Sequence, residues 1–263
     1  MKKTVFIVLG TIAAISILFV LLIVLPAVEE YNSKKRVFSD LQIRLDEVSS
    51  TVIGILPKTV EGGVVIYGSG GSGVIFERDK NTYYALTAAH VVADENASYK
   101  AYTVFNEYSD KVDENFYYKL ADVNIEYISP TTDLAVVSFY YGEELNVARL
   151  ENNMPNRFDR IMCIGHPDGK KQTVSYGYIT SDLKRVGISN TDLHSRSVYY
   201  VLEHNAYLNS GSSGGPAFSE NMKLAGINTG GLFGIFGRFR KGYLMPCDQL
   251  SECIMQWKDG KTE

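Results

Sequence analysis

The stretch Gly211-Ser212-Ser213-Gly214-Gly215-Pro216 places serine hydroxyls on a tight turn between glycines. Glycine has no Cβ, so it adopts positive φ angles and allows another backbone to approach closely. A serine hydroxyl is a weak nucleophile until a neighbouring base accepts its proton and a third group orients that base. The stretch therefore predicts that a histidine and a carboxylate elsewhere in the chain serve this turn.

Two upstream motifs supply the expected partners. Thr87-Ala88-Ala89-His90-Val91 ends an apolar run with a histidine, and Thr132-Asp133-Leu134-Ala135-Val136-Val137 puts a carboxylate at the mouth of an apolar strand. The unperturbed pKa of imidazole lies near neutrality, which suits His90 to proton transfer, and Asp133 would fix its tautomer. Taken alone, His90 is better explained as a buried structural histidine, and Asp133 has the alternative of a solvated turn residue. Only the combination favours catalysis.

Other residues of the same types are weaker candidates, because they lack such partners or do not stand directly before an apolar strand. The histidines that we interpret as structural are His166, His194 and His204, and the acids that rival Asp133 by position are Asp110 and Asp122.

The order His, Asp, Ser is the chain order of chymotrypsin. The sequence resembles the chymotrypsin-fold, or trypsin-like, serine peptidases, and among them the bacterial HtrA (Deg) type. Several blocks in register rarely arise by chance, and here they extend over about Val48 to Leu250. The blocks that carry the resemblance are Gly71-Ser72-Gly73-Val74-Ile75, Ile164-Gly165-His166-Pro167, Thr173-Val174-Ser175-Tyr176-Gly177-Tyr178-Ile179, Gly226-Ile227-Asn228-Thr229 and Leu244-Met245-Pro246.

The resemblance assigns roles in the serine turn. The family pattern Gly-x-Ser-Gly-Gly-Pro implies that Ser213 is the nucleophile, whereas Ser212 falls where the family varies and Ser210 is weaker still. It also implies an oxyanion hole formed by the backbone N–H groups of Gly211 and Ser213, with that of Ser212 nearby.

Substrate-binding residues also follow from the resemblance. Asn228, Thr229 and Gly230 match the segment on which family substrates pair as an added strand, and Tyr207 falls at the base of the primary specificity pocket. Tyr207 stands where an aspartate would favour Lys or Arg, and Asn228 stands where glutamate-specific relatives carry histidine. We expect cleavage after small or medium aliphatic residues.

The strand pattern predicts an all-β fold. Short runs rich in Val, Ile, Tyr and Thr, punctuated by glycine, predict a protease domain at 51–263 made of two antiparallel six-stranded β-barrels. The first barrel would occupy about 51–142 and the second about 158–250, followed by a short C-terminal helix. His90 and Asp133 would then come from the first barrel and Ser213 from the second.

The N-terminal residues predict a membrane anchor. Val5–Leu25 is apolar and uncharged, close to the roughly 20 residues that cross a bilayer, so we expect a signal anchor at 1–28; a cleaved leader is the alternative. A linker with an amphipathic helix would follow at 29–50. Basic residues flank both sides of the run, and the resemblance therefore decides the orientation: a single-pass protein of the cell membrane with its protease domain outside the cytoplasm.

Composition limits the partners and cofactors. The net charge of −4 and the scattered basic residues argue against nucleic acid binding, and no metal-ligand spacing occurs among the histidines and cysteines, so we expect neither metal nor cofactor. The three cysteines cannot all pair internally. We expect isolated thiols, although Cys247 and Cys253 could form a short bridge.

The glycine-rich segment Gly230–Gly242 has two interpretations. Its phenylalanines alternate with glycines and precede Arg238, Arg240 and Lys241. A hairpin whose aromatic residues line the pocket is favoured over a mobile loop that gates the site or touches a membrane surface.

These observations predict a serine endopeptidase that acts on proteins through an acyl-enzyme. The alternative is a catalytically quiet peptide-binding or chaperone module of the same fold, and hydrolysis of non-peptide esters is a third possibility. The resemblance also implies a homotrimer. The HtrA type usually carries a PDZ domain after the protease, which the seventeen residues 247–263 would not accommodate.

Overall fold

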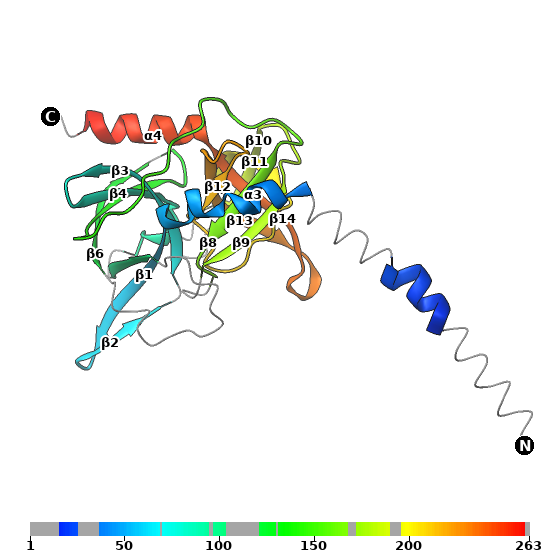
Figure 1. The fold of residues 1–263 in the computed structure, drawn as a ribbon. Coiled ribbons are helices and arrows are strands. Elements are labelled where there is room, and N and C mark those ends of the chain that lie inside the picture. Colours follow the sequence, from blue (N-terminus) through cyan, green and yellow to red (C-terminus); the bar gives the residue numbers. More distant parts are fainter. Residues whose placement is uncertain are drawn as a thin grey trace, which may run out of the picture. The chain divides into compact units, whose positions relative to one another are not determined.

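The computed structural model describes residues 16–25, 37–68, 70–94, 97–103, 121–129, 131–167, 172–189 and 196–260. The chain forms two compact units, Met1–Ile43 and Arg44–Glu263, which are described separately below. The second unit holds both sheets (Figure 1). Its bounds also include His90, Asp133 and Ser213.

The first unit contains helical residues. Residues 16–25 are helical, with a π-helical stretch η1 (Val20–Val24), and α3 (Ser39–Ile43) is a short α-helix. Among the described residues, no helix combines the length and the apolar character needed to span a bilayer. Most of the predicted anchor, 1–15 and 26–28, lies outside the described residues.

The first sheet is a closed barrel with a protruding hairpin. Its strand order is β2-β1-β3-β4-β7-β6-β5, and β1 also pairs with β5 from Ile53↔Thr103 to Lys58↔Ser98, which closes six strands into a barrel. The end of β1 continues beyond the barrel and pairs with β2 alone. Stacked Tyr83 and Phe139 lie in the core. The strands are β1 (Val52–Glu61), β2 (Val64–Tyr67), β3 (Gly71–Asp79), β4 (Thr82–Thr87), β5 (Ser98–Thr103), β6 (Ala121–Ile128) and β7 (Ala135–Tyr140).

The second sheet has seven strands in the order β10-β11-β14-β13-β12-β8-β9 and remains a half-barrel. The prediction of a second closed six-stranded barrel is wrong because β10 pairs with the edge of β11 that would otherwise join β9. Among the described residues, an isolated bridge, Ile179↔His204, joins the residue after β9 to the end of β11. The strands are β8 (Arg160–Gly165), β9 (Thr173–Tyr178), β10 (Lys184–Ser189), β11 (Arg196–His204), β12 (Pro216–Phe218), β13 (Leu224–Phe233) and β14 (Phe239–Pro246).

The predicted C-terminal helix is present as α4 (Cys247–Asp259), which begins directly after β14 and packs against the first barrel. Its Trp257 is buried, with ring centroids 5.8 Å from Phe76 in β3 and 4.9 Å from Tyr84 in β4. Lys258 forms a salt bridge of 2.5 Å with Glu77. The helix therefore links the two sheets at the side seen at the top of Figure 1.

Short helical turns lead into the first barrel. η2 (Leu45–Glu47) and η3 (Ser49–Thr51) follow α3, so the region expected to form an amphipathic helix is divided into three short pieces. Its apolar positions are largely buried, among them Leu41 and Leu45.

Candidate active site

His90 and Asp133 form a close pair inside the first barrel. His90 lies in the 3₁₀ turn η4 (Ala89–Val91) after β4, and Asp133 lies in the turn before β7. The Asp133 carboxylate binds His90 twice: Oδ2 is 2.7 Å from Nδ1, and Oδ1 accepts the backbone N–H at 3.0 Å. The Asp133 side chain is 1 % exposed and that of His90 is 19 % exposed. Asp133 thus fixes the Nδ1 edge of the imidazole, and another part of the ring reaches the surface.

The second sheet also contacts this carboxylate. Thr229 of β13 is buried, and its hydroxyl donates a hydrogen bond to Asp133 Oδ2. A buried carboxylate is costly unless charge-assisted hydrogen bonds satisfy it. Three donors satisfy the Asp133 carboxylate: the His90 N–H, His90 Nδ1 and the Thr229 hydroxyl. Asp133 therefore orients His90 and also joins the two sheets.

The serine turn lies before β12 and is built around glycines. Gly211 and Gly214 have φ angles of +85° and +81°, where residues with a Cβ are disfavoured. A Cβ on Gly214 would also lie 2.1 Å from the Ser72 carbonyl oxygen. The Gly214 N–H donates to the Asn228 carbonyl at 2.7 Å. The turn is therefore wedged between β3 and β13, with Ser213 at its centre.

Ser72 of β3 is the residue that sequence reasoning missed. Its N–H donates to the Ser213 carbonyl at 2.7 Å, and its hydroxyl donates to the Gly211 carbonyl at 2.8 Å. The same oxygen accepts the His166 N–H at 2.8 Å. The block Gly71-Ser72-Gly73 was visible in the sequence, but a serine between glycines does not reveal its partner. Ser72 thus binds the Gly211–Ser212 and Ser213–Gly214 peptide groups of the serine turn.

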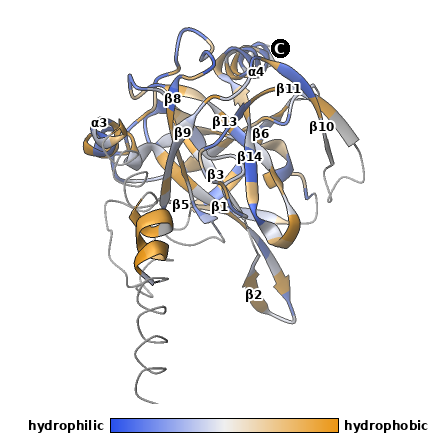
Figure 2. Cartoon of the chain, turned by 90° about the vertical axis from the view of Figure 1, so that its right-hand side faces the viewer, coloured by the Kyte–Doolittle hydropathy of each residue, from blue (hydrophilic) through white to orange (hydrophobic). Residues whose placement is uncertain are grey.

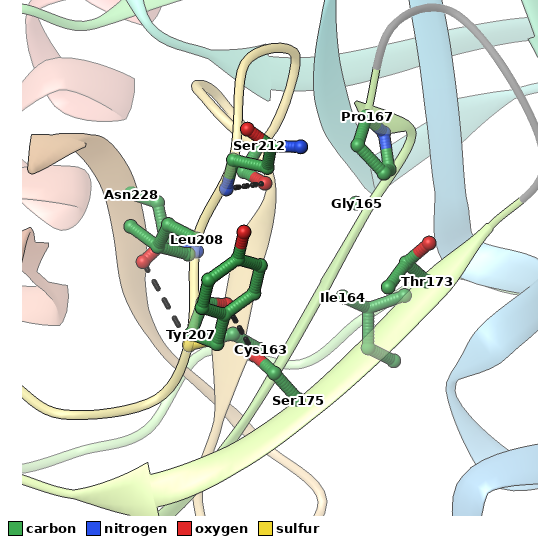
Figure 3. A pocket seen from close by; sticks show the side chains of 11 residues that line it. Cys163, Ile164, Gly165, Pro167, Thr173, Ser175, Tyr207, Leu208, Ser212 and Asn228 are labelled. Carbon is green, nitrogen blue, oxygen red and sulfur yellow. Dashed lines mark hydrogen bonds between the residues drawn. The ribbon is translucent and has the colours of Figure 1, made fainter. Parts of the chain in front are cut away.

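A cavity of about 220 Å³ adjoins the serine turn in the second sheet (Figure 3). Three of the residues predicted to bind substrate or the oxyanion line this cavity: Tyr207, Ser212 and Asn228. Thr229 was also predicted to bind substrate, but its hydroxyl is hydrogen-bonded to Asp133. Its described lining residues include no carboxylate and no basic side chain, so the cavity suits an uncharged group. They are Cys163, Ile164, Gly165, Pro167, Thr173, Ser175, Tyr207, Leu208, Asn209, Ser212 and Asn228.

The remaining candidates are poorly suited to proton transfer or nucleophilic attack. Burial lowers the pKa of His204 to about 4, so this histidine is neutral at pH 7. Burial raises the pKa of Cys163 to about 12, so its thiol stays protonated. Asp122 is exposed on β6 and paired with Lys100. His194 and Asp110 lie outside the described residues.

All three cysteines are free and buried, as expected from their number, and Cys247 and Cys253 form no bridge. Within the described part of the chain, no group of His, Cys, Asp or Glu is arranged to hold a metal ion.

Comparison with known families identifies the family of the fold. The trypsin-like peptidase domain matches residues 71–227, which is more than half of the chain and includes His90, Asp133 and Ser213. The chain belongs to this family. Its matching relatives are of the HtrA type, which confirms the resemblance inferred from the sequence blocks.

Two relatives illustrate the similarity of this trypsin-like domain to HtrA proteins. "Serine protease Do-like HtrA" of Bacillus subtilis is 28 % identical over 208 residues, covering 73 % of this chain and 42 % of the relative. "Periplasmic serine endoprotease DegP" of Escherichia coli K12 is 29 % identical over 187 residues, covering 71 % and 35 %. The chain thus spans less than half the length of these relatives.

A solved structure supports the fold of the trypsin-like domain. The crystal structure of the inactive form of Rv3671c from M. tuberculosis H37Rv aligns with a TM-score of 0.58 and 16 % identity, covering 82 % of this chain and 90 % of that one. At this identity the likeness concerns the fold alone.

We expect Ser72→Ala to destabilise the trypsin-like domain. Loss of the hydroxyl leaves the buried Gly211 carbonyl and His166 N–H without this partner, which should lower the free energy of unfolding by about 1–3 kcal/mol. Urea denaturation of the full chain measures the change. Ser98→Ala is the matched control, because its exposed hydroxyl makes only a 3.3 Å bond to Lys58, and it should stay within about 0.5 kcal/mol of wild type. Equal losses in both variants would contradict the bridging role of Ser72.

Proposed function

We propose that the protein is a serine endopeptidase with Ser213 as nucleophile, His90 as general base and Asp133 as the group that orients His90. The observation that carries the proposal is the buried Asp133 carboxylate, bonded at 2.7 Å to His90 Nδ1 in a chain that also has a glycine-flanked serine turn. A carboxylate bonded to Nδ1 fixes the imidazole tautomer in which Nε2 carries the lone pair, which is the form that a general base needs.

The proposed reaction consists of two acyl transfers, first to Ser213 and then to water. Ser213 Oγ attacks the peptide carbonyl carbon while His90 accepts the hydroxyl proton, and the imidazolium then protonates the leaving amine. Water next attacks the acyl-enzyme and gives a proton to His90, which returns it to Ser213 as the carboxylic acid product leaves. Asp133 would stabilise the imidazolium in both steps.

Two backbone donors are proposed for the oxyanion hole. Among the described residues, no acceptor bonds to the N–H of Gly211 or Ser213, which supports their availability to a developing oxyanion. The Ser212 N–H donates to the Asn209 carbonyl at 3.0 Å. We therefore do not include Ser212 among the proposed oxyanion-hole donors, although the sequence predicted its N–H nearby. The Ser72 bonds to the Gly211 and Ser213 carbonyls hold the neighbouring peptide groups, 211–212 and 213–214, and would thereby restrict the backbone that carries the two donors.

The relatives support the same activity, since their names identify them as serine proteases and, for DegP, as a periplasmic endoprotease. A catalytically quiet peptide-binding module is the alternative. The His90–Asp133 geometry favours the enzyme, because a binding module does not require a buried carboxylate against an imidazole.

We also infer that Val5–Leu25 anchors the protein in the cell membrane, with the protease domain outside the cytoplasm. The run carries no charged residue, and Ile17, Leu18 and Phe19 are exposed in its described helical part. The periplasmic location named for DegP supports the extracytoplasmic side.

Alkaline carbonate extraction tests the anchor. We expect the full chain to remain in the membrane pellet, because about 20 apolar residues partition into the bilayer core. A variant lacking residues 1–28 should move to the supernatant. Release of the full chain into the supernatant would contradict anchoring.

The nucleophile is tested with Ser213→Ala in the full chain. Cleavage of unfolded casein should fall by a factor on the order of 10⁶, because removing a triad nucleophile disables the whole unit. Labelling by a serine-directed fluorophosphonate should also vanish. Ser210→Ala is the matched control from the same turn, and both readouts should persist in it. Labelling retained in Ser213→Ala would rule out Ser213 as the nucleophile.

A peptide library tests the selectivity. We expect preferred cleavage after small or medium aliphatic residues, because uncharged residues such as Ile164, Leu208 and Asn228 line the cavity. Preferred cleavage after Arg or Glu would contradict this assignment of the cavity, and it would leave the proposed nucleophile unaffected.

A further inference from the structure

The turn between β13 and β14 carries large apolar side chains into the solvent. Ile235 is 79 % exposed and Phe236 is fully exposed, and Leu232 and Phe233 at the end of β13 are also exposed. Aromatic and aliphatic residues in sequence at a loop tip form a compact apolar surface. Such a surface commonly marks an interaction site.

The turn has a defined conformation. The Gly234 N–H donates to the Arg238 carbonyl at 2.7 Å, and the Gly237 N–H donates to the Gly234 carbonyl at 3.2 Å. Phe236 has a φ of 62°, a conformation that is unfavourable for a bulky residue. Glycine would fit this position with less strain, yet a phenylalanine occupies it. Backbone strain of this kind is typical of functional sites.

The charges beside the tip are positive. Arg238 and Arg240 are exposed, and among the described residues neither has a carboxylate partner, whereas Lys241 forms a 2.5 Å salt bridge with Glu203. No Asp or Glu occurs between Lys223 and Pro246. The hairpin therefore combines an apolar tip with two guanidinium groups available to anions.

A second apolar hairpin projects from the same side of the body. In β1 and β2, Val60, Val64, Val65 and Ile66 are exposed around the turn Glu61-Gly62-Gly63. Figures 1 and 2 both draw this hairpin and the β13–β14 hairpin extending toward the lower side, and β2 is coloured as hydrophobic in Figure 2. Glu61 is the acidic residue of this second turn, so the positive charge lies mainly at the β13–β14 tip.

We propose that the β13–β14 tip, assisted by the β1–β2 hairpin, docks on the surface of a bilayer that contains anionic lipids. Phenylalanine and isoleucine partition into the interface between headgroups and acyl chains, and flanking arginines bind anionic headgroups. Two separate narrow tips suit a fluid, planar surface better than a single protein partner, which would need a continuous interface on the order of 1,000 Å².

Docking would set the height of the cavity above the bilayer. Asn228 lies on β13, seven residues before Ile235, and at about 3.3 Å per residue the tip is roughly 20 Å away along the hairpin. Phe239 of the same hairpin packs at 5.4 Å on Tyr207, which lines the cavity. The docked protein would thus present its cavity to protein segments that lie close to the membrane surface.

Tryptophan fluorescence of the full chain tests the proposal without relying on catalysis. The native Trp257 is buried, so Phe236→Trp adds an emission that reports on the tip. Vesicles of phosphatidylcholine with phosphatidylglycerol would carry bromine on their acyl chains, which quenches tryptophan on contact. The matched control is Tyr140→Trp, since Tyr140 is exposed at the end of β7 where it pairs with Thr82.

We expect bromolipid to quench the added emission at position 236 and to leave that at position 140 unchanged. Adding Arg238→Gln should lower the equilibrium constant for tip contact about fivefold, as expected for loss of one basic residue near an anionic surface. No quenching at position 236, or equal quenching at both positions, would overturn the proposal. A blue shift at position 236 that grows with protein concentration without vesicles would also overturn it, because the tip would then bind a second copy.

Discussion

The buried carboxylate of Asp133 is the constraint on which the rest of the site depends. A charge removed from water must be satisfied by hydrogen bonds, and here the donors come from His90 in the first sheet and Thr229 in the second. The cost of leaving this charge unpaired therefore penalises any separation of the sheets. The same bonds that stabilise the junction also fix the tautomer and the orientation of the imidazole.

The serine turn is likewise held by residues of both sheets. Its glycines permit a backbone path that no other residue could follow between Ser72 and Asn228, and hydrogen bonds from both sheets then hold it. The position of Ser213 thus depends on contacts between sheets more than on the turn itself. A serine held in this way is preorganised, so little conformational entropy would be lost if it acts as the proposed nucleophile.

Local motifs were sufficient to predict the pairing of His90 with Asp133, the all-β fold and the free cysteines. Long-range pairing explains what the sequence could not predict. The second sheet stays open because β10 pairs with the edge of β11 that β9 would need to close a barrel. The sequence does not show which of these two strands pairs with β11. The role of Ser72 and the outward direction of Phe236 depend likewise on neighbours that residue spacing does not specify.

The position of α4 in the chain also determines when its packing on the first barrel can form during synthesis. The helix follows both sheets in the chain, and its Trp257 packs on Phe76 and Tyr84, residues made long before it. A nascent chain that has completed β14 still lacks this packing between its sheets. The packing of α4 on the first barrel therefore forms only after translation has passed Trp257, when every strand of both sheets has already been made.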